Sequence, residues 1–158
     1  MRKTEFEPEK RAYSKAVWLL GRRDHTRKEL FDKLRRDYEE EPARLAVEKL
    51  ADLGYLDDEE TARKLAVYLI TRRYFSPKRA VQELVFRGID RELAQHICED
   101  QEVDIKEQIL DLLNGKYANK LADEKSVRRT IANLQRLGYE FGDIKSALNE
   151  VVNQEDSL

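Results

Sequence analysis

Apolar residues recur along the chain at the three- and four-residue spacing of helices. Three segments in the first third show it clearly, residues 13–20, 30–34 and 43–53. This spacing gathers apolar side chains on one side of a helix and leaves polar side chains on the other. Later segments follow the same pattern, including one around residues 105–113. The chain is therefore predicted to be all-α.

Capping residues divide the pattern into separate helices. Thr26 with Glu29 has the spacing of a capping box, and Ser76 before Pro77 is typical of an N-cap followed by proline in the first turn. Further boundaries are expected at residues that favour helix ends, with Asp57 and Asp90 at starts and Gly54 after a helix.

Comparison of the chain with itself shows a period of 50 residues. Three sets of equivalent residues carry it: Thr26, Ser76 and Ser126; Leu34, Leu84 and Leu134; and the pairs Arg22-Arg23 and Arg72-Arg73. A unit of about 50 residues hardly buries a core alone, so three stacked three-helix repeats are the simplest explanation. We place them at residues 1–56, 57–102 and 103–158 and expect an elongated, curved molecule.

Composition excludes several functional classes. Charged residues make up 39% of the chain, with only 6 Gly and 3 Pro, and no glycine-rich phosphate loop occurs. The single Cys98 and two histidines offer no disulfide framework or zinc site. No long apolar span or secretion signal is evident. We therefore expect a cytoplasmic protein without cofactor, metal or catalytic activity. A monomer is expected, although composition leaves the oligomeric state open.

The charge is unevenly distributed within the repeats. Basic residues outnumber acidic ones by seven to four in residues 22–37, by five to one in 72–87 and by four to two in 122–137. These equivalent windows total +9 in a chain of net charge −2, so the remainder carries −11. Positive charge thus concentrates at one place in each repeat.

A basic stripe facing phosphates or an acidic protein groove is the functional interpretation of this pattern. The alternative is that these cations complement helix C-termini and solvate an outer face. The candidate residues are Arg22, Arg23, Lys28, Arg72, Arg73, Lys78, Arg79, Arg128 and Arg129.

Aromatic residues near the basic windows have two interpretations each. Trp18 and Tyr68 are expected to be core or inter-repeat contacts rather than stacking platforms. Tyr74 and Phe75 interrupt the basic stretch 72–79, where they would engage a base or a partner, or form an apolar plug between repeats. His25 is expected to be a turn residue.

The ordered motifs resemble those of the bacterial RecX family. The resemblance rests on residues 23–34, on the segment Leu53-Gly54-Tyr55-Leu56-Asp57-Asp58, on residues 72–89 and on Leu137-Gly138-Tyr139. It covers roughly residues 10–150. The family often has glycines immediately before the central proline, where this chain has Phe75 and Ser76.

This resemblance implies a regulator that binds the filament of the RecA recombinase on single-stranded DNA. Members typically inhibit ATP hydrolysis and strand exchange, and they have no catalytic residues to transfer to this chain. The alternative is a direct DNA-binding protein that presents the basic helices of its three-helix modules to nucleic acid.

Overall fold

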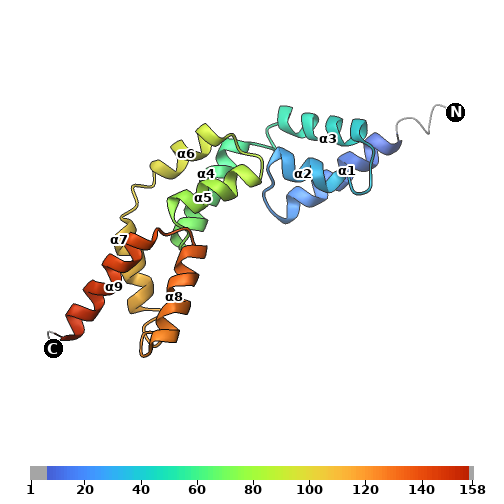
Figure 1. The fold of residues 1–158 in the computed structure, drawn as a ribbon. Helices are drawn as coiled ribbons and strands as arrows, with labels where there is room; N and C mark the ends of the chain where they lie inside the picture. Colours follow the sequence, from blue (N-terminus) through green and yellow to red (C-terminus); the bar gives the residue numbers. More distant parts are fainter. Residues whose placement is uncertain (1–6, 157–158) are drawn as a thin grey trace. The chain divides into compact units, whose positions relative to one another are not determined.

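The described part of the chain is entirely helical outside its turns. A computed structural model describes residues 7–156, which form nine α-helices and no strand (Figure 1). The helices are α1 (Glu7–Arg22), α2 (Arg27–Leu34), α3 (Glu40–Asp52), α4 (Asp58–Thr71), α5 (Pro77–Phe86), α6 (Arg91–Glu99), α7 (Ile105–Asn114), α8 (Glu124–Arg136) and α9 (Phe141–Asp156). The all-α prediction is confirmed.

The helices follow one another as three groups of three, here called the first, second and third repeats. In the first, α1 packs against α2 and α3 around a buried cluster that includes Leu30, Leu34 and Leu50. In the third, α9 packs against α7 and α8 around Ile109, Leu134 and other apolar residues.

The chain also divides into two compact units. One comprises the residues up to Leu65 with Glu83–Ala94, and the other comprises Ala66–Gln82 with the residues from Gln95 onward. Each helix of the second repeat contributes to both units. The repeat boundaries at 56/57 and 102/103, and the elongated shape, stay predictions.

Helix starts agree with the capping residues predicted in the first two repeats, and the third repeat uses a different position. Thr26 and Glu29 form the complete capping box, and the Arg79 N–H donates to Ser76 Oγ at 3.1 Å. Asp123 caps α8 by accepting from the Ser126 N–H at 2.7 Å, so Ser126 lies inside the first turn. The helix equivalent to α2 therefore begins three residues earlier in the third repeat.

The buried residues confirm the repeat register, but in α1 most of them are not the apolar residues that the spacing predicted. Leu34, Leu84 and Leu134 are all fully buried. In α1 the buried residues are Ala12, Ala16 and Leu19, so the core side of this helix is rotated from the stripe predicted over residues 13–20.

The N-cap hydroxyl of one repeat also bonds to the next repeat. Thr26 Oγ1 donates to the Arg87 carbonyl at 2.5 Å, and Ser76 Oγ donates to the Gly138 carbonyl at 2.9 Å. Each acceptor lies in the turn after the second helix of the following repeat. The same hydrogen bond therefore recurs 50 residues later in the chain. At both junctions between consecutive repeats, a buried hydroxyl gains a partner from the next repeat.

Candidate functional site

Basic side chains of the first repeat gather where α1 ends and α2 begins. A pocket of about 460 Å³ is lined by Trp18, Leu19, Arg22, Arg23, His25 and Lys33. The Arg22 guanidinium lies 4.9 Å from the centre of the Trp18 ring, within the range of a cation–π contact. Arg23 donates to Glu29 Oε2 at 3.1 Å. These contacts hold Arg22 against the aromatic ring and Arg23 against a carboxylate, and both arginines line the pocket.

His25 lies in the turn between α1 and α2, as expected, and its side chain is buried behind these cations. The Lys33 ammonium donates to His25 Nε2 at 3.0 Å, so Nδ1 carries the ring proton and donates to the Arg23 carbonyl at 2.9 Å. Burial, with the positive charges of Arg23 and Lys33, lowers the pKa of His25. Desolvation and the nearby Arg23 guanidinium lower the pKa of Lys33.

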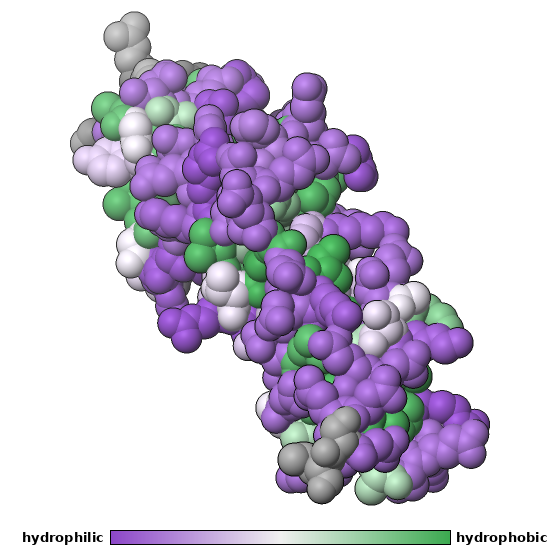
Figure 2. All heavy atoms as spheres, turned by 90° about the vertical axis from the view of Figure 1, so that its left-hand side faces the viewer, coloured by the Kyte–Doolittle hydropathy of each residue, from purple (hydrophilic) through white to green (hydrophobic). Residues whose placement is uncertain are grey.

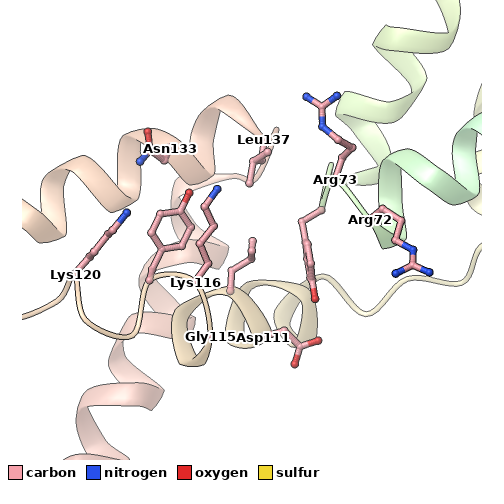
Figure 3. A pocket seen from close by; sticks show the side chains of 11 residues that line it. Arg72, Arg73, Asp111, Gly115, Lys116, Lys120, Asn133 and Leu137 are labelled. Carbon is pink, nitrogen blue, oxygen red and sulfur yellow. The ribbon is translucent and has the colours of Figure 1, made fainter.

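A second basic pocket lies in the other compact unit. Its volume is about 700 Å³, and its walls come from the turn after α4, from α7 and the segment following it, and from α8. Arg72 and Arg73 stand on one side and Lys116 and Lys120 on the other (Figure 3). The carboxylate of Asp111 points away from the two lysine amino groups in this view. The arrangement suits an anionic ligand that extends between the two walls.

Backbone geometry fixes the turn that carries the two arginines. Tyr74 adopts a left-handed conformation with φ of 56°, which is uncommon for a residue with a Cβ. Its carbonyl accepts a hydrogen bond from the buried Tyr139 hydroxyl at 2.6 Å. Phe75 is buried, with Arg73 and Arg79 within 5.1 and 4.7 Å of its ring centre. Phe75 therefore fills the role of an apolar plug.

Other members of the predicted stripe form ion pairs. Lys28 pairs with Asp32 at 2.9 Å within α2. Lys78 pairs with Glu140 at 3.0 Å across a repeat junction. Arg128 pairs with Glu124 at 3.4 Å within α8, between side chains that are mostly exposed. These cations remain predicted contacts, but a ligand would have to compete with a carboxylate at each.

Arg129 lies one turn before Asn133 on α8, and Asn133 lines the larger pocket. Residues four apart share a side of a helix, so Arg129 extends the cationic surface toward this pocket. The Asp123 carboxylate, whose pKa is lowered mainly by the hydrogen bond from Ser126, is close enough to feel the Arg129 charge as well.

Sequence reasoning missed four cations that the structure adds to these pockets. Lys33 and Arg36 lie beside Arg23, and a pocket shared with α5 is lined by all three. Lys116 and Lys120 follow α7, where the arginine pair of the earlier repeats has no counterpart. The sequence does show one signal for them, because the two lysines are four residues apart with Tyr117 between them. In the structure both amino groups lie within 5.5 Å of the centre of the Tyr117 ring.

Trp18 and Tyr68 do not lie in the core, which was one of their two predicted places, and a contact between repeats stays a prediction for both. They are 51% and 50% exposed, respectively, because the buried side of α1 passes through Leu19 and that of α4 through Leu69. Figure 2 shows one face of the molecule, on which hydrophilic side chains predominate and apolar areas are smaller. Exposed aromatic rings beside cations are the kind of side chain on which nucleic-acid bases stack.

The described residues contain no group of three or more His, Cys, Asp or Glu side chains arranged to hold a metal ion. Among residues 7–156, no helix combines the length and apolar character needed to cross a membrane. The charged segment 1–6, used in predicting that no secretion signal is present, lies outside the described residues.

Comparison with known proteins identifies the family. A family model described as "RecX, first three-helix domain" matches residues 12–50. "Regulatory protein RecX" of Stenotrophomonas maltophilia (strain R551-3) is 33% identical over 135 residues, covering 84% of this chain and 82% of that protein. The chain belongs to the RecX family. A RecX of the same description from Trichlorobacter lovleyi is 35% identical over 133 residues, covering 80% of this chain and 86% of its own.

Solved structures support the same fold. The crystal structure of RecX from Lactobacillus salivarius matches with a TM-score of 0.68 and 23% identity, covering 91% of this chain and 96% of that one. The RecX relatives are named regulatory proteins rather than enzymes. This agrees with the absence of a recognisable catalytic constellation in the sequence.

Proposed function

We propose that this RecX protein binds RecA filaments on single-stranded DNA and inhibits their ATP hydrolysis and strand exchange. Membership of the RecX family, established over most of the chain, carries the proposal. The role itself is the one implied by the family resemblance of the sequence. The protein acts by binding, and its own residues perform no bond-breaking step.

The two basic pockets supply surfaces suited to this role. Each presents several cations beside an aromatic ring, with Arg22 and Arg23 in one and Arg72 and Arg73 in the other. Such surfaces attract phosphates and acidic protein segments, both of which a filament on DNA offers. The acidic remainder of the chain opposes tight association with bare DNA through its charge of −11.

The direct test is a titration of this protein into RecA that is hydrolysing ATP on single-stranded DNA. A parallel titration with RecA omitted measures binding to the same DNA. Inhibition at concentrations well below those that occupy bare DNA would support filament binding. An unchanged hydrolysis rate at saturating protein would refute the proposal.

Direct DNA binding is the second candidate, because the larger pocket holds Lys116 and Lys120, whose amino groups lie beside the Tyr117 ring. It predicts inhibition only where bare DNA is already coated. Its affinity would also fall steeply with salt, with a slope of log K against log salt of about −0.7 per phosphate contacted on a single strand.

A further inference from the structure

Two exposed aromatic rings occupy equivalent positions in the first and second repeats. Trp18 on α1 and Tyr68 on α4 are 50 residues apart and are exposed to the same degree, 51% and 50%. An arginine follows each ring after one helical turn, Arg22 in the first repeat and Arg72 in the second. Residues four apart are neighbours on a helix surface. The pairing of ring and cation is therefore part of the repeat.

In the first repeat the pairing forms a small site. The Arg22 guanidinium and the Lys15 ammonium lie 4.9 and 4.4 Å from the centre of the Trp18 ring. The adjoining pocket of about 460 Å³ also receives Arg23 and Lys33, and no acidic side chain is among the described residues that line it. An apolar plane thus lies directly beside several positive charges.

In the second repeat, backbone hydrogen bonds hold the two arginines at the residue that carries the ring, and the Tyr68 ring itself does not line the adjoining pocket. The N–H groups of Arg72 and Arg73 both donate to the Tyr68 carbonyl, at 2.9 and 3.2 Å, where α4 ends. Both arginines then line the pocket of about 700 Å³. The third repeat has alanines at the equivalent positions 118 and 122, so it lacks both ring and arginine.

We infer that Trp18 and Tyr68 are each a stacking platform for a base of single-stranded nucleic acid, with the neighbouring phosphate contacting the arginine one turn after the ring. Single-stranded nucleic acid presents a planar base and an anionic phosphate in every nucleotide, so one nucleotide supplies a partner for both the ring and the cation of a repeat. Non-specific single-strand binding combines the same two features, aromatic rings for bases and a cationic groove for the backbone. An acidic peptide would satisfy the arginines and leave both rings without a planar partner.

Arg22 does not obstruct this stacking, because its long side chain is exposed and its guanidinium rests over the ring through a cation–π contact alone among the described residues. A base takes its place on the indole, and the displaced guanidinium contacts the neighbouring phosphate. The inference rests on the second candidate function, direct DNA binding, and deepens it by naming the two rings that hold the bases.

Trp18 is the only tryptophan in the chain, so its fluorescence reports on this site alone. Titration of the full-length protein with oligothymidylate, without RecA, should quench the emission. Trp18→Ala and Tyr68→Ala, measured by anisotropy of a labelled oligonucleotide, should each raise Kd about 5- to 150-fold, the range expected for one stacked base. Trp18→Phe should restore most of the affinity, because it retains a planar ring.

Tyr55→Ala is the matched control, because Tyr55 is an exposed aromatic, 69% accessible, without an arginine one turn later. Its Kd should equal that of the wild type. Circular dichroism verifies that every variant keeps its helicity, as expected for exposed side chains.

The same titration with polyglutamate identifies the other class of ligand. Quenching by polyglutamate but not by oligothymidylate would overturn the inference in favour of an acidic protein partner. Unchanged Kd values for Trp18→Ala and Tyr68→Ala would overturn it as well. Inhibition of RecA by the wild type is scored separately, so loss of the stacking sites and loss of the proposed function give different results.

Discussion

Gly88 and Gly138 share a backbone conformation that only glycine adopts without strain. Both have φ of 99°, and both lie in the turn that receives the N-cap hydroxyl of the preceding repeat. A Cβ at Gly88 would stand 2.5 Å from Lys28 Cβ, and one at Gly138 would overlap Ser76 Oγ. Glycine is therefore needed at both positions for two reasons. It adopts the left-handed turn without strain, and it leaves room for a side chain of the preceding repeat.

Replacing Gly88 with alanine should destabilise the protein by about 1–3 kcal/mol, from left-handed strain together with the contact on Lys28. Gly21→Ala is the matched control, since Gly21 lies in α1 with nothing near an added Cβ, and it should stabilise by about 0.5–1 kcal/mol. Urea denaturation followed by circular dichroism measures both. Equal effects of the two substitutions would contradict the requirement for glycine in this turn.

His25 makes stability depend on pH in a defined direction. Burial lowers its pKa, so the folded protein binds a proton at this site less readily than the unfolded chain, whose histidine titrates near 6.5. Where only the unfolded state binds the proton, falling pH favours unfolding. The contribution of the neutral ring is therefore complete above about pH 7 and is lost as pH falls below about 6.5.

The free energy of unfolding of the wild type should accordingly fall more between pH 7 and pH 5 than that of His25→Gln, because glutamine cannot take up the proton. Urea denaturation at each pH gives the free energy of unfolding of both proteins. The value for His25→Gln is subtracted from that of the wild type, so that the contribution of the carboxylates, which titrate in both proteins, cancels. His96→Gln serves as the comparison variant, since the His96 side chain is 66% exposed. Parallel curves for wild type and His25→Gln would show that the buried ring does not titrate with folding.

At the scale of elements, apolar spacing and caps predicted most helices because both signals are local. The capping box at Thr26 and the start at Ser76 depend on residues three apart, which the sequence displays directly. The start of α8 was not predicted, because Asp123 competes with Ser126 as N-cap and only the fold shows which one is used. The rotation of α1 that exposes Trp18 was also hidden, since both possible stripes contain apolar residues.

Helix α5 offers a test of the predicted core within a single element. Leu84 is fully buried, whereas Phe86, two residues later, is 77% exposed. Leu84→Ala should destabilise by about 2–5 kcal/mol through reduced burial and the cavity left behind. Phe86→Ala, which removes a larger side chain from the surface, should change stability by less than about 0.5 kcal/mol. Thermal denaturation measures the loss of stability in each variant. A larger loss for Phe86→Ala than for Leu84→Ala would mean that α5 buries a different side from the one described.

At the scale of the whole molecule, the sequence identified where the positive charge is concentrated but not its full composition. The windows around Arg22 and Arg72 were visible from the period of 50 residues. Lys116 and Lys120 were not, because they lie outside the third window and reach the pocket only through the packing of the third repeat against the turn after α4. Long-range packing, which no local pattern encodes, thus completes the candidate site.

Reversing charge in the larger pocket should therefore weaken inhibition of RecA more than the same reversal elsewhere. Arg72→Glu with Arg73→Glu should raise the concentration for half-maximal inhibition at least about 10-fold, since hydrogen bonds to charged groups contribute about 1.5–3 kcal/mol each. Lys10→Glu with Arg11→Glu, on exposed positions of α1, changes net charge equally and should have little effect. Equal effects of the two pairs would mean that overall charge, and not this pocket, governs inhibition.

The salt dependence of the same variants separates the two kinds of partner. If the arginines bind phosphates of a single strand, their reversal should flatten the slope of log K against log salt by about 1.4, which is about 0.7 for each of two phosphates no longer neutralised. If they bind acidic protein surface, affinity for RecA filaments should fall while the slope for bare DNA stays as in the wild type. Binding to filaments and to bare DNA, each measured at several salt concentrations, therefore assigns the pocket to protein or to nucleic acid.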